Sequence, residues 1–130
     1  MNITNKFLIV IFTFFYFNVL AEEIESIKSS ERIAYFFYQK GDIDRAIEEY
    51  EHISKKNPNN PLFHYNLGCL YAKNNYYYLA IKEFRKAIET DSSVKNHALY
   101  NLAVIFGKYL NDTDSATKYY REFMEAESQD

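Results

Sequence analysis

The sequence predicts an all-α fold built from repeated pairs of helices. Beyond Glu22, apolar residues recur every three or four positions, which is the pattern of amphipathic helices, and no segment alternates like a strand. Only three glycines and two prolines occur in 130 residues, so regular elements are long and turns are few. The stretch HYNLGCLYAK, which starts at His64, returns as LYNLAVIFGK from Leu99. This recurrence indicates a structural unit that is built more than once.

Six helices of about 12 to 15 residues are expected from the apolar runs and the breaks between them. In the first break, Gly41 is a candidate C-cap and Asp42 a candidate N-cap. In the second, Asn60 precedes Pro61, a capping residue before a proline at the first helical position. The six runs are Ile33 and Phe37; Ile43, Ala46, Ile47, Tyr50 and Ile53; Leu67, Leu70 and Tyr71; Leu79, Ala80, Phe84, Ala87 and Ile88; Leu99, Leu102, Ala103 and Phe106; and Ala116, Tyr119, Tyr120 and Phe123.

The helices follow one another with a regular period. Ile33, Leu67 and Leu102 occupy matching positions, 34 and 35 residues apart. Steps of 34, then 35 or 36, relate four further trios, which are Ala34, Gly68 and Ala103; Phe37, Tyr71 and Phe106; Ala46, Ala80 and Ala116; and Tyr50, Phe84 and Tyr120. Small residues allow close helix contact and large rings fill the space between pairs. A period near 34 residues is typical of a solenoid of helix–turn–helix units, whose neighbouring copies complete a shared core.

On these residues, the sequence resembles the tetratricopeptide repeat family. The second repeat, 61–94, carries the family's residues as Leu67-Gly68, Tyr71, Ala80, Phe84 and Ala87, and repeats 27–60 and 95–127 carry matching positions. The third repeat departs from the pattern, since it has one extra residue before its first helix, another in its turn, and Phe123 in place of the last Ala. The resemblance implies about three repeats in a domain spanning 22–130.

The first 21 residues have the layout of a secretory signal peptide. A single Lys and no acid precede the apolar run Phe7–Leu20, and Val19 and Ala21 stand at the −3 and −1 positions of a small-residue cleavage site. The run is shorter than the ~20 residues of a spanning helix. Two interpretations stay open. Cleavage after Ala21 would release a secreted, periplasmic or cell-envelope protein, whereas an uncleaved segment 1–21 would anchor the domain in the membrane.

The composition argues against several classes of function. A formal charge of −3 without a basic stripe does not suit nucleic acid. His52, His64 and His97 fall on different helices without metal-ligand spacing, and no glycine-rich phosphate loop is present. The single cysteine, Cys69, is expected to be a small buried apolar group. We therefore expect no enzyme activity, no metal and no cofactor.

The family resemblance implies that the first helix of each pair lines a concave surface. Tyrosine rings and asparagine amides on that face suit a peptide, because rings supply contact area and amides bond main chain. Alternatively, several of these tyrosines only shield the contacts between helices. The predicted partner-binding residues are Tyr35, Tyr38, Tyr65, Asn66, Lys73, Tyr100, Asn101 and Lys108.

One known role within the family is not expected. Some relatives bind the C-terminal carboxylate of heat-shock chaperones through a cluster of Lys, Arg and Asn. Only Asn66 matches that cluster, and the other four places hold Glu31, Tyr35, His97 and Asn101. The cationic clamp is therefore missing from this sequence.

The last helix, roughly Thr113–Glu127, is followed by no covering helix in this sequence. Solenoids usually end in a polar-faced capping element, so an apolar strip here indicates an interface. The predicted interface residues are Tyr119, Phe123 and Met124. The sequence as a whole predicts an exported scaffold or assembly factor that binds a protein or peptide. The alternative is a membrane-anchored subunit that forms homo-oligomers through this last helix.

Overall fold

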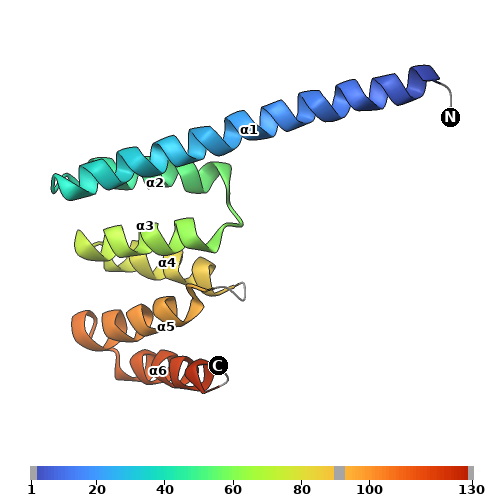
Figure 1. Cartoon of the computed structure of the whole chain (residues 1–130). Helices are drawn as coiled ribbons and strands as arrows, with labels where there is room; N and C mark the ends of the chain where they lie inside the picture. Colours follow the sequence, from blue (N-terminus) through green and yellow to red (C-terminus); the bar gives the residue numbers. More distant parts are fainter. Residues whose placement is uncertain (1–2, 90–92, 129–130) are drawn as a thin grey trace.

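The computed structural model describes residues 3–89 and 93–128, and all regular structure in these ranges is helical. The elements are α1 (Ile3–Gln39), α2 (Ile43–Lys56), α3 (Pro61–Lys73), α4 (Tyr77–Ile88), α5 (Lys95–Val104), η1 (Ile105–Tyr109) and α6 (Thr113–Glu127). The element η1 is a π-helical continuation of α5. Three antiparallel hairpins, α1–α2, α3–α4 and α5/η1–α6, pile up in sequence order (Figure 1). The all-α repeat fold expected from the sequence is confirmed.

The first helix is much longer than expected. α1 runs unbroken for 37 residues, from the apolar N-terminal segment into the first hairpin, and projects far beyond the stack (Figure 1). The expectation of 12 to 15 residues was wrong for this helix because nothing between Leu20 and Ile27 is a glycine or proline that would break it. The side chains from Asn5 to Ser26 are all exposed.

The hairpin turns share one design. Gly41, Asn75 and Asn111 take positive φ angles of 77°, 64° and 54°, and each ends the first helix of its hairpin in the left-handed conformation. Asn tolerates this conformation better than other residues with a Cβ. The expected N-cap Asp42 accepts a hydrogen bond from the Arg45 amide, and Asp112 accepts one from Ser115 at the matching turn.

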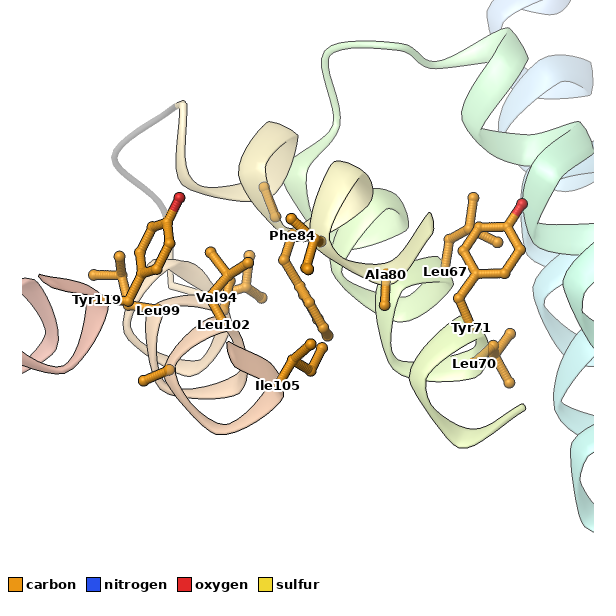
Figure 2. Close-up of a cluster of buried hydrophobic side chains, with 14 of the residues drawn as sticks. Leu67, Leu70, Tyr71, Ala80, Phe84, Val94, Leu99, Leu102, Ile105 and Tyr119 are labelled. Atoms are coloured by element: carbon orange, nitrogen blue, oxygen red, sulfur yellow. The ribbon is translucent and has the colours of Figure 1, made fainter. Parts of the chain in front are cut away.

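The core is continuous from hairpin to hairpin. One cluster joins Leu67, Leu70 and Tyr71 of α3 to Phe84 of α4, and continues to Leu102 of α5 (Figure 2). Phe84 is completely buried against Gly68, where a Cβ would lie only 2.8 Å from its ring. No hairpin buries its apolar face alone, as expected for a solenoid.

On the last helix, α6, the expected exposure of Tyr119 was wrong. Tyr119 is only 6% exposed, because its ring stacks on Phe106 at 5.5 Å and its hydroxyl accepts a 3.0 Å hydrogen bond from Arg85. It therefore belongs to the core and not to an exposed strip. Tyr120 is 51% exposed instead, and Met124, which was expected to be exposed, lies beside it at a similar value.

Candidate peptide-binding groove

The first helices of the hairpins, α1, α3 and α5/η1, border a groove made of two neighbouring hollows. The first hollow, about 220 Å³, lies between α1 and α3, and the second, about 290 Å³, lies between α3 and α5/η1. Cys69 and Lys73 line both, so the two hollows are neighbours on either side of α3, and together they are called the groove. Four predicted residues line the first hollow, namely Tyr35, Tyr38, Asn66 and Lys73, and Asn101 lines the second.

Hydrogen bonds across the groove tie neighbouring hairpins together. The Lys73 ammonium donates to the Tyr38 hydroxyl at 3.2 Å and lies 4.3 Å from the centre of that ring. The Asn66 amide donates to the Tyr50 hydroxyl at 3.2 Å, and the Asn101 amide contacts the Cys69 sulfur at 3.9 Å. A side-chain amide has two donor hydrogens and an acceptor oxygen. One bond per amide therefore leaves capacity for the main chain of a bound segment.

Two ionisable side chains at the groove, Cys69 and Tyr65, are uncharged at neutral pH. Burial raises the pKa of the Cys69 thiol above its ordinary value, and the hydrogen bond with Tyr65 lowers it by less. Burial, together with the neighbouring Cys69, raises the pKa of Tyr65 to about 12. Both groups are therefore mostly protonated at neutral pH, and Cys69 carries a smaller thiolate fraction than an ordinary cysteine, which does not suit a catalytic nucleophile. Lys73 is the charged side chain that lines both hollows.

Three predicted residues lie outside the two hollows. Tyr65 and Tyr100 line a third hollow of about 360 Å³ toward α6, where Tyr65 meets His97 and Tyr100 packs on Phe123. Lys108 lies with Tyr100 at the exposed end of the last hairpin. The predicted set is thus divided between the groove, its flank and the end of the stack.

Sequence reasoning missed two tyrosines of the groove. Tyr50 reaches the first hollow from α2 although its spacing indicated a core ring. Tyr109 lines the second hollow and is held there by stacking on Tyr77, with ring centres 4.5 Å apart. Its position depends on the π turn of η1, and the extra residue in the third turn is the one feature of the sequence that signals such a turn.

The histidine with the clearest partners has a structural role. His64 is buried, its Nδ1 lies 2.7 Å from a Glu83 carboxylate oxygen, and its Nε2 lies 2.7 Å from the Pro58 carbonyl oxygen. Lys86 donates to the same carboxylate at 2.9 Å. These bonds fasten the α2–α3 connection to α4. Within the described part of the chain, no group of three or more His, Cys, Asp or Glu side chains is placed to hold a metal ion.

Three family models of the tetratricopeptide repeat match residues 34–75, 61–93 and 97–128. Together they cover 34–128 except for 94–96. The chain is a tetratricopeptide repeat protein. No curated protein sequence matches it significantly.

Solved structures show the same fold. The N-terminal domain of stress-induced protein-1 (STI-1) from C. elegans has a TM-score of 0.71 at 18% identity, covering 78% of this chain and 84% of that one. MamA has a TM-score of 0.69 at 19% identity, covering 85% of this chain and 63% of that one. At such low identity, these likenesses concern the repeat architecture alone. The repeats support a role as a protein–protein interaction module.

Proposed function

We propose that this tetratricopeptide repeat module binds an extended or helical segment of a partner protein in the groove, as an exported scaffold or assembly factor. The observation that carries the proposal is that the two neighbouring hollows share Cys69 and Lys73 as lining residues. Each hollow is smaller than the ~300–1,000 Å³ typical of cofactor and drug sites. Hollows of this size in a row suit successive side chains of one peptide, and the groove amides suit its main chain.

The export part of the proposal rests on α1. It is the one described helix that is long and apolar enough to cross a membrane, and its apolar N-terminal side chains are exposed. A cleaved signal peptide and an uncleaved anchor would both place the repeats outside the cytosol. Mass spectrometry of the protein from its native cell separates them. A chain that starts at Glu22 identifies the released form, and an intact N-terminus identifies the anchored form.

Cys69 provides a direct test of the groove, because it is the only cysteine and lines both hollows. The full chain is treated with a thiol-alkylating reagent in the presence of fractions of its native cell envelope. A partner in the groove is expected to slow the alkylation. Lys73→Ala and Asn66→Ala are expected to abolish that protection, because both side chains line the first hollow.

The matched control is Lys82→Ala, an exposed lysine on α4 that lines neither hollow. It is expected to keep full protection. If a partner binds while Cys69 alkylates at the rate of the free chain, the partner uses another surface and the groove proposal is wrong. Tyr65→Ala and Tyr100→Ala then report whether the flanking hollow is the surface used.

A second candidate function is a membrane-anchored structural subunit that forms oligomers through α6. The observation that favours it is the half exposure of Tyr120 and Met124 on the last helix. We expect the full chain in mild detergent to be larger than a monomer by light scattering, and Met124→Glu to reduce it to a monomer. A strict monomer at all concentrations would remove this candidate and leave the groove proposal intact.

A further inference from the structure

The two ends of the stack expose surfaces whose matching surfaces face each other at both contacts between hairpins inside the chain. α3 packs on α2, and α5 packs on α4. Among the described residues, α6 has no following helix and α1 has no preceding one (Figure 1). Leu67 and Leu70 of α3 are buried, whereas the matching Ile33 and Phe36 of α1 are 40% and 55% exposed.

At the opposite end, a ring position that is buried in the preceding hairpin is exposed. Phe84 of α4 is completely buried, and the matching Tyr120 of α6 is 51% exposed. Tyr120 lines a shallow hollow with Val104 and Ala116, where the first helix of another hairpin would continue the stack. We propose that α1 of a second copy of this chain occupies this place, seated on α6 as α3 is seated on α2.

Charge complementarity supports this occupant. Across the α2–α3 contact, the Asn74 amide donates to the Asp44 carboxylate at 2.8 Å. By the repeat spacing, the residue of α6 that matches Asp44 is Asp114, and the last residue before the turn that matches Asn74 is Lys40. Both are exposed. The hydrogen bond between an amide and a carboxylate inside the chain thus corresponds, at the junction between copies, to an ammonium facing a carboxylate.

A second pair follows from the same correspondence. Across the α4–α5 contact, the Arg85 guanidinium lies 5.9 Å from the centre of the Phe106 ring. The matching residues at the proposed junction are Arg121 of α6 and Phe37 of α1 in the second copy. A guanidinium over an aromatic face is a favourable contact. The open ends therefore carry opposite members of two pairs, and each pair has a counterpart in a contact inside the chain.

This inference rests on the candidate function in which α6 forms oligomers, and it names the partner surface. The contact joins two different faces of the molecule, so it is heterologous, and every added copy again presents an open end. Head-to-tail chains or rings are expected, and not closed two-fold dimers.

The test uses the full chain with Cys69→Ser in its membrane, expressed as two copies with different tags. One copy carries Lys40→Cys and the other carries Asp114→Cys, and a thiol cross-linker is added. Within one copy, Lys40 directly follows α1 and Asp114 belongs to α6, and these two helices lie at opposite ends of the stack (Figure 1). A cross-link between the two tags is expected only when both cysteines are present. The matched control replaces Asp114→Cys by Lys82→Cys on exposed α4 and is expected to give several-fold less product.

Phe36→Glu, added to the Lys40→Cys copy, is expected to remove the cross-link without unfolding the chain, because Phe36 is exposed in the single copy. Circular dichroism verifies the fold. Equal cross-linking with Lys82→Cys, or none with Asp114→Cys, overturns the inference. If Met124→Glu still dissociates an oligomer in that case, α6 binds something other than α1, and the candidate function survives. If no oligomer exists, both fall, and the groove is unaffected.

Discussion

Replacing Gly68 by alanine tests a close contact between α3 and α4 in the core. A Cβ at this position would lie 2.8 Å from Cδ1 and Cε1 of the Phe84 ring and 3.1 Å from its Cγ. The ring is completely buried in the core cluster that joins α3 to α5. It therefore has little room to move away from a methyl group, so either the ring or the α3–α4 distance must change.

Two effects of opposite sign set the magnitude. Overpacking a dense core costs about 1–3 kcal/mol, and the upper half of that range applies where the displaced ring has no exposed side. Glycine to alanine inside a helix stabilises by about 1 kcal/mol. The net expectation is that Gly68→Ala lowers the free energy of unfolding by about 1–2 kcal/mol. The steric effect wins because Phe84 is enclosed by α5 as well as α3.

The measurement is a urea titration of the full chain in nonionic detergent, followed by far-ultraviolet circular dichroism. Gly107→Ala is the matched control, because its new Cβ would meet only the Ala116 methyl at 3.3 Å near the exposed end of the stack. This control is expected to be neutral or stabilising by up to about 1 kcal/mol. Equal stabilisation by both substitutions would refute the reasoning, since it would show that Phe84 can yield without cost.

Two further predictions concern polar contacts. Glu83→Leu removes the acceptor of the buried His64 ring and is expected to lower the free energy of unfolding by about 1–3 kcal/mol. Adding His64→Phe should recover most of that loss. If the losses of the two substitutions simply add, the coupling between the two residues is contradicted. The Ser115 hydrogen bonds hold the pKa of Asp112 below its ordinary 3.8. The stability that this carboxylate contributes is therefore present above 3.8 and lost as pH falls further. The difference in unfolding free energy between wild type and Asp112→Asn should shrink on acidification, and a difference independent of pH would oppose it.

The repeat architecture could be predicted from the sequence because it depends on side-chain size at fixed intervals. Gly68, Phe84 and their counterparts specify helix contact and filling, and these requirements are local and repeated. The turns were predictable where Asp or Asn caps a helix, as at Asp42. The length of α1 was not predictable, because the pattern of a signal or anchor segment indicates a unit separate from the domain. Helix propensity continues across Ala21, whether or not the chain is later cleaved there.

The candidate groove was less predictable than the fold. The spacing of helix faces correctly grouped Tyr35, Tyr38, Asn66 and Lys73, which line one hollow. It failed for Tyr119, because the adjacent Tyr119 and Tyr120 cannot both face the core and helical spacing alone does not decide between them. In the structure Tyr119 stacks on Phe106, and Tyr120 is left exposed.

The third turn shows how an irregular repeat keeps its register. In the first two hairpins, the amides of Asp42 and Tyr76 bond to the carbonyls of Phe37 and Tyr71, five residues earlier. In the third hairpin, the Asp112 amide bonds to the matching carbonyl of Phe106, six residues earlier.

The additional residue therefore lies between Phe106 and Asp112, where η1 widens the helix by one residue per turn. The left-handed Asn111 and the N-cap Asp112 keep the same roles as Gly41 and Asp42. Because the π turn absorbs the insertion inside the first helix, α6 starts in register and can pack Ala116 and Tyr119 against it. Tyr109, which the same π turn places in the second hollow, is thus a groove residue created by the insertion.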